Sequence, residues 1–181
     1  PELKIQSTYV KDHFDKKENP LAITMSFRKN GQALNKNQLA EIFNKSNNTI
    51  TILIHGLCMN DLQWTREGHN HGELLEKELG HTVIYLHYNT GLHVSENGRQ
   101  LSQLLNEIEI NTDITINFLT HSMGGLVVRS ACFYAKQLKS TWSKSVEKII
   151  FLGTPHHGAI LAKGGHMLDV FLEISPYSAP F

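Results

Sequence analysis

Residues 120–125, Thr-His-Ser-Met-Gly-Gly, have the types and spacing that present a serine hydroxyl for attack on a carbonyl carbon. They follow an apolar run typical of a strand and precede an apolar run typical of a helix. A serine at such a junction sits in a strained turn called a nucleophile elbow. The positions two residues away on each side must be small, and Gly124 meets that need while Gly125 gives further room. Thr120 stands where the motif usually has glycine. The pattern predicts Ser122 as the nucleophile.

A serine hydroxyl is a weak nucleophile and needs an adjacent base, usually a histidine oriented by a carboxylate. It also needs donors for the negative oxygen of the tetrahedral intermediate. The segment 54–57, Ile-His-Gly-Leu, closes an earlier strand, and in folds with this elbow that loop supplies one such amide. We therefore expect the backbone amides of Leu57 and Met123 to form an oxyanion hole. We interpret His55 as structural, and His55 and Gly56 as lining the substrate.

A second group of polar residues follows the strand after the predicted elbow helix. Residues 153–158 read Gly-Thr-Pro-His-His-Gly, and we expect them at the same sheet edge as Ser122. We interpret His156 and His157 as residues that line the substrate site. The lesser alternative is that one of them is the catalytic base.

Three other histidines are weighed against the same roles. His121 is next to Ser122 in the turn, and a ring there cannot easily reach the same hydroxyl, so we reject it as the base. His69 and His71 lie near acidic residues, but no companion ligand motif accompanies them. We therefore predict no metal site.

The elements that must position these residues alternate between strand and helix, which predicts a mainly parallel sheet covered on both faces. We expect strands over 23–28, 49–55, 82–88, 114–119 and 146–152. We expect helices over 37–44, 72–79, 94–108, 123–136 and 167–174, and a loop over 153–165.

The composition agrees with one globular domain over residues 1–181, since 40% of the residues are hydrophobic. The 17 basic and 17 acidic residues cancel, so nothing favours a nucleic-acid partner or an anionic membrane. We interpret Cys58 and Cys132 as free thiols rather than a disulfide framework. No apolar run reaches about 18 residues, so we expect no membrane span. No signal peptide is visible, so cytoplasmic is the default location, which a removed leader would overturn.

Several of these motifs together resemble the bacterial lipase-like serine esterases related to the GPI inositol-deacylase group, within the α/β-hydrolase superfamily. The likeness is carried by residues 53–57 (Leu-Ile-His-Gly-Leu), 120–129 (Thr-His-Ser-Met-Gly-Gly-Leu-Val-Val-Arg) and 152–158 (Leu-Gly-Thr-Pro-His-His-Gly), with support from 85–98 and 174–181. The resemblance implies a three-layer α/β-hydrolase fold with a mainly parallel central sheet. It also implies cleavage of lipid-like or short-chain acyl esters, without a cofactor or metal. Ser122 carries over as nucleophile, and Leu57 and Met123 as oxyanion-hole amides.

The chain departs from this family after residue 155. In this fold the order along the chain is serine, then aspartate or glutamate, then histidine. The acid normally follows the strand after residues 153–155, and the histidine comes one strand later, but the sequence reaches Phe181 before either strand. The downstream candidates are Asp169 and Glu173 as acids and His156, His157 and His166 as bases. We therefore interpret the chain as a hydrolase domain without its C-terminal strands; a minimal hydrolase with a rearranged triad is the alternative.

Two further hypotheses stay open. An unpaired sheet edge favours a homo-oligomer if the chain is truly truncated. Because fold does not fix function, the chain is alternatively a non-catalytic binding module, or a thioesterase or amidase on the same scaffold.

Overall fold

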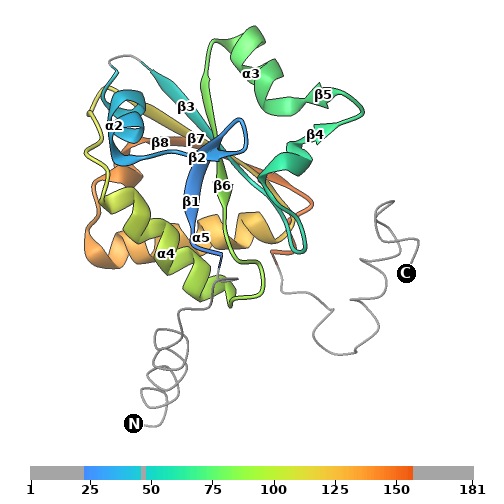
Figure 1. Cartoon of the computed structure of the whole chain (residues 1–181). Coiled ribbons are helices and arrows are strands. Elements are labelled where there is room, and N and C mark those ends of the chain that lie inside the picture. Colours follow the sequence, from blue (N-terminus) through green and yellow to red (C-terminus); the bar gives the residue numbers. More distant parts are fainter. Residues whose placement is uncertain (1–22, 46–47, 157–181) are drawn as a thin grey trace, which may run out of the picture.

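The computed structural model describes residues 23–45 and 48–156. Its centre is a six-stranded sheet in the order β2-β1-β6-β3-β7-β8 (Figure 1). Its strands are β1 (Ser26–Lys29), β2 (Gln32–Ala33), β3 (Thr49–Ile54), β6 (Thr82–His87), β7 (Thr115–His121) and β8 (Val146–Leu152). A separate two-stranded sheet joins β4 (Thr65–Arg66) to β5 (His69–Asn70). The helices are α2 (Lys36–Asn44), α3 (His71–Leu79), α4 (Val94–Asn106) and α5 (Met123–Leu138), with 3-10 helices η1 (Asp61–Trp64) and η2 (Trp142–Ser145).

The sheet is mostly parallel, as the alternating strand and helix pattern predicted. Strands β6, β3, β7 and β8 run parallel, and the short β1 pairs antiparallel with both β6 and β2. Strand β3 lies in the middle, and its residues from Ile50 to Ile54 are all buried. A strand covered on both faces needs apolar side chains on both, which explains its nearly continuous apolar run. The carboxyl ends of the parallel strands meet at one edge, where ligands bind in sheets of this kind.

Helices cover the two faces of the sheet unequally. On one face α2, α4 and α5 pack on the larger core, while α3 lies on the other side (Figure 1). The larger core includes Phe27, Phe43, Ile52, Ile84, Leu101, Leu105, Phe118, Val127 and Trp142. The smaller core, on the α3 side, is formed by Leu53, Trp64, Val83 and Tyr85. The sheet therefore has helices on both faces, but on the α3 side the packing is centred on β3 and β6.

Among the described residues, β8 lies at one edge of the sheet and β2 at the other. The β8 residues Ile150 and Leu152 pair in register with Leu119 and His121 of β7, and are 47% and 43% exposed. Exposed apolar side chains on an edge strand favour association with another strand or chain.

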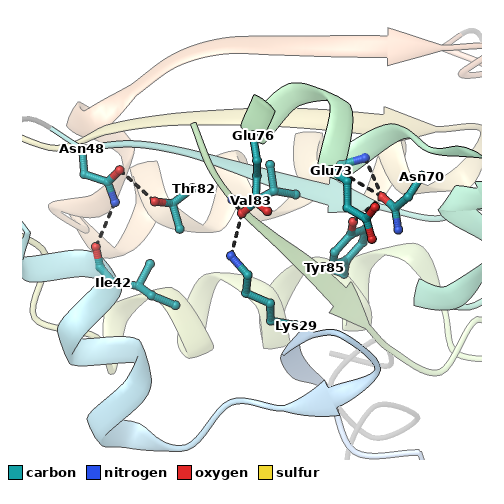
Figure 2. A network of polar contacts seen from close by, with 10 residues as sticks. Lys29, Ile42, Asn48, Asn70, Glu73, Glu76, Thr82, Val83 and Tyr85 are labelled. Atoms are coloured by element: carbon teal, nitrogen blue, oxygen red, sulfur yellow. Dashed lines mark hydrogen bonds and ion pairs between the residues drawn. The ribbon is translucent and has the colours of Figure 1, made fainter. Parts of the chain in front are cut away.

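A polar network holds α3 against the sheet (Figure 2). The Asn70 side chain caps the helix by accepting hydrogen bonds from the amides of Gly72 and Glu73. Its Oδ1 also accepts a hydrogen bond from the Tyr85 hydroxyl at 2.8 Å. Farther along the helix, Glu76 accepts from Lys29 at 2.6 Å and from the Val83 amide at 3.0 Å. The Asn70 cap explains why α3 begins at residue 71, one residue before the predicted start.

Some predicted boundaries were wrong by a few residues. The first strand begins at Ser26, not at Ile23, which is exposed. Strands β3 and β6 end one residue earlier than predicted, and α4 ends two residues earlier, at Asn106. The expected helix at 167–174 and most of the expected loop at 153–165 lie outside the described residues. Within the described part of the chain, no helix is long and apolar enough to cross a bilayer.

Candidate active site

Ser122 lies at the turn between β7 and α5, with φ 50° and ψ −119°. A non-glycine residue with positive φ is strained by about 1–3 kcal/mol and persists only where its surroundings fix it. Two backbone hydrogen bonds fix this turn: the Ser122 amide donates to the Leu152 carbonyl at 2.8 Å, and the Gly125 amide donates to the Ser122 carbonyl at 3.2 Å. Ser122 is 7% exposed. The turn therefore has the geometry that the elbow pattern predicted.

Gly124 and Gly125 let the first turn of α5 pack directly on two sheet strands. A Cβ atom at Gly124 would lie 2.6 Å from the Ile54 carbonyl oxygen and 2.7 Å from that of His55. A Cβ atom at Gly125 would collide with the Thr154 side chain. Because backbone atoms cannot move aside cheaply, position 124 requires glycine at this packing distance.

Thr120 occupies the place where the elbow motif usually has glycine. Its side chain is fully buried, and its hydroxyl donates to the Ile150 carbonyl of β8 at 2.9 Å. A buried hydroxyl is costly unless it is hydrogen-bonded. The neighbouring strand thus supplies the partner that makes threonine acceptable here.

The loop after β3 lies against the Ser122 turn. A Cβ atom at Gly56 would be 3.1 Å from the Cβ of Ser122 and 3.0 Å from the Nδ1 of His121. Leu57 directly follows Gly56, and Met123 directly follows Ser122. The two amides predicted to form the oxyanion hole therefore belong to two segments that are in contact.

His55 is the first residue of this loop and is fully buried. Its Nδ1 lies 3.0 Å from the Gly56 carbonyl oxygen, to which it donates. Its ring stacks on Tyr88 with centroids 4.4 Å apart, and the Tyr88 hydroxyl donates to the His55 carbonyl at 2.7 Å. Burial lowers the pKa of His55 to about 4, so the ring is neutral at neutral pH. Burial raises the pKa of Tyr88.

His156 is held by the elbow helix. Arg129 of α5 donates from Nη1 to the Nδ1 of His156 at 3.0 Å, and the His156 ring packs edge-to-face on Phe151 with centroids 4.6 Å apart. Because a guanidinium only donates, this Nδ1 is an acceptor. No hydrogen bond joins His156 to Ser122 among the residues that the structure describes. The candidates His157, His166, Asp169 and Glu173 lie outside those residues.

The other histidines that the sequence analysis weighed are also placed. Burial lowers the pKa of His121, whose Nδ1 is buried. His69 and His71 contact each other edge-to-face, with ring centroids 5.1 Å apart. Within residues 23–45 and 48–156, no group of three or more histidine, cysteine or acidic residues is arranged to hold a metal. Cys58 and Cys132 are free thiols, and Cys58 is exposed on the loop after β3.

Sequence reasoning missed a buried charged group beside this loop. Asp61 is 5% exposed, and its Oδ1 accepts hydrogen bonds from Nη1 of Arg28 at 3.3 Å and from Nδ1 of His87 at 2.9 Å. These partners are 33 and 26 residues away along the chain. In the sequence, Asp61 is visible only as an aspartate a few residues after His55-Gly56, and nothing around it indicates that its side chain is buried.

The mostly parallel sheet with its helices, and the strained serine between β7 and α5, define an α/β-hydrolase-like scaffold. The chain belongs to the family described as domain of unknown function DUF7379, which it matches over residues 21–175. No curated protein matches the chain.

Two solved structures of one Bacillus licheniformis lipase, BlEst2, share the fold. The structure in propeptide form is 26% identical, with a TM-score of 0.53, and the match covers 70% of this chain and 28% of that one. The structure in mature form is 20% identical, with a TM-score of 0.54, and the match covers 81% of this chain and 56% of that one. The chain therefore spans between about a quarter and just over half of the lipase chains it matches.

Proposed function

We propose that Ser122 is the nucleophile of a serine hydrolase that cleaves carboxylic esters, with lipid-like or short-chain acyl groups, through an acyl-enzyme. The observation that carries the proposal is the positive φ of Ser122 between a mostly buried strand and a helix that buries one face on the sheet. In a turn that only connects a strand to a helix, a serine in a strained backbone conformation would cost stability without any function in return. The likeness to a lipase supports the same scaffold.

The chemistry assigned to the site runs in two halves. The Ser122 Oγ attacks the ester carbonyl carbon while a base takes its proton, and the carbonyl oxygen becomes negative. The amides of Leu57 and Met123 donate to that oxygen, each contributing about 3 kcal/mol. The bond to the alcohol then breaks, the base returns the proton to the alcohol, and the acyl group stays on Ser122 until water removes it. No metal or cofactor takes part in these steps.

The base and its carboxylate are assigned to residues outside the described part of the chain. Within that part, the Ser122 hydroxyl has no hydrogen bond to a histidine, and the Nδ1 of His156 is taken by Arg129. His55, Gly56, His156 and His157 are assigned to the lining of the substrate site, since Gly56 lies against Ser122 and His156 lies on the flank of α5.

A non-catalytic binding module is the second candidate, and one observation favours it. The described residues supply no base for Ser122, and a module that binds without reaction needs none. A thioesterase or amidase would share every feature of the first proposal, so only a comparison of substrates separates these activities.

Hydrolysis of p-nitrophenyl esters by the natural full-length protein tests the proposal. The expected result is turnover that Ser122→Ala abolishes. Ser143→Ala is the control, because Ser143 lies in η2 before the amino end of β8, whereas Ser122 follows the carboxyl end of the neighbouring parallel strand β7. Turnover that survives in Ser122→Ala would contradict the proposal, and no turnover by a folded wild-type protein with ester, thioester and amide substrates would favour the binding module.

A further inference from the structure

The loop that carries Leu57 leaves β3 at His55 and ends at Asp61, the first residue of η1. Its first end is anchored by the Tyr88 hydroxyl and by the stacked rings of His55 and Tyr88. Between the anchors Cys58 has φ 56°, a backbone conformation that a non-glycine residue adopts only when it is held. The loop conformation therefore depends on what fixes its two ends.

The second end is anchored by charge. Asp61 is buried and joins two strands at once, accepting from Arg28 of β1 at 3.3 Å and from His87 of β6 at 2.9 Å. Hydrogen bonds to ionised groups are roughly twice as strong as neutral ones. Just before it, the Asn60 side chain caps η1 by accepting from the Leu62 amide at 2.9 Å. The end of the loop is thus tied to two strands of the sheet.

This arrangement costs desolvation of a carboxylate, which an apolar side chain at the same place would avoid. Among the described residues, the hydrogen-bond partners of the Asp61 side chain are Arg28 and His87, and neither is Ser122. Asp61 lies four positions after Leu57, on the segment whose backbone contacts Ser122 through Gly56. Placement of that loop is the role that explains both its burial and its partners.

We propose that Asp61, held by Arg28 and His87, is a positioning residue that fixes the loop 56–60 so that the Leu57 amide faces the oxyanion. The proposal rests on the ester hydrolysis proposed above. An oxyanion forms only during reaction, so a displaced donor lowers kcat and leaves substrate binding largely unchanged. A displacement near 1 Å lowers rates by up to about 100-fold.

The test compares Asp61→Asn with Glu76→Gln in the natural full-length protein. Glu76 is the control because it is also a carboxylate with an ion pair, to Lys29, but it is only partly buried and it holds α3, not the loop. Three quantities are measured for each variant: kcat and KM with a p-nitrophenyl ester, amide hydrogen exchange of residues 56–60, and the urea midpoint of unfolding.

Asp61→Asn is expected to lower kcat by about 10- to 100-fold with KM changed less than about threefold, and to speed exchange in residues 56–60. Glu76→Gln is expected to lower the urea midpoint while kcat stays at the wild-type value. Equal kcat in wild type and Asp61→Asn, or a fall in kcat that follows the urea midpoint alike in both variants, would overturn the proposal.

Two further comparisons keep the outcome decisive. If Asp61→Asn does not fold, His87→Leu and His87→Gln are compared in its place. The glutamine side-chain amide can still donate to Asp61, so only the leucine variant should lower kcat. If the wild-type protein hydrolyses no ester, the proposed function fails, and exchange alone decides the role of Asp61. Faster exchange confined to residues 56–60 would then support the positioning role, and unchanged exchange would refute it.

Discussion

The backbone at Gly56 lies against the Cβ of Ser122, since a Cβ atom added at Gly56 would be 3.1 Å from it. This contact joins the end of β3 to the end of β7, which are neighbouring parallel strands. Two turns about 65 residues apart in the sequence thereby lie side by side at the carboxyl edge of the sheet. The proposed reaction depends on this contact, because it brings the loop with Leu57 beside the nucleophile.

Gly56→Ala is expected to lower turnover by about 10-fold or more, because the added methyl group must push the loop away from Ser122. The loss of stability should be modest, about 1–2 kcal/mol, as for other small overpacked sites. Gly91→Ala is the control, because its Cβ would meet only the Asn89 side chain. Ester turnover and urea unfolding give the two values, and unchanged turnover in Gly56→Ala would contradict the contact's importance.

Thr120→Val is expected to destabilise the fold by about 1 kcal/mol, because it removes the hydroxyl that donates to the Ile150 carbonyl. Thr120→Ser keeps that hydroxyl and should stay closer to wild type. Urea unfolding measures both variants. Equal stability of the valine and serine variants would show that this hydrogen bond does not account for threonine at the position.

Stability is expected to fall as the pH drops from about 6.5 to about 4, because burial lowers the pKa of His55 to about 4 from its ordinary 6.5. In this window the unfolded chain holds a proton on His55 that the folded chain rejects, so protonation favours unfolding. The contribution amounts to about 2 kcal/mol between about pH 7 and about pH 5. Burial of His121 acts in the same direction.

Urea unfolding at both pH values, for wild type and His55→Gln, measures this contribution. The variant lacks the titrating ring, so its stability should change less between the two pH values. An equal change in both proteins would mean that His55 is not the group responsible.

The polypeptide of residues 1–181, produced alone, is expected to associate through the exposed apolar side chains of β8, Ile150 and Leu152. Light scattering should give a mass above that of the 20.5 kDa chain. The double variant Ile150→Lys with Leu152→Lys should shift the mass toward one chain. A wild-type polypeptide that remains monomeric at high concentration would contradict this expectation.

The sequence predicted the long elements of this fold well, because each has either a sustained apolar run or apolar residues at helical spacing. The strand at 146–152 and the start of α5 at Met123 were placed to the residue. Strands β2, β4 and β5 have two residues each, too few for any periodicity to be read.

What the sequence did not reveal at the candidate site depends on contacts between distant segments. The elbow was visible because its strand, turn and helix are contiguous. The two hydrogen bonds to Asp61 could not be predicted from the sequence, because their donors Arg28 and His87 come from two other strands. The sequence also did not show why threonine is accepted at position 120. Its hydrogen-bond partner is the Ile150 carbonyl, which lies on another strand, β8. Local sequence patterns predict helices and strands, but the burial of a charged side chain depends on how the strands are arranged in the folded sheet.

The most direct test of the central claim is covalent labelling of the natural full-length protein with a fluorophosphonate, followed by mass spectrometry of its peptides. The account predicts one modified residue, Ser122, and no labelling in Ser122→Ala, while Ser143→Ala labels as wild type does. A folded wild-type protein that takes up no label, or takes it up at another residue, would contradict the claim that Ser122 is an activated nucleophile.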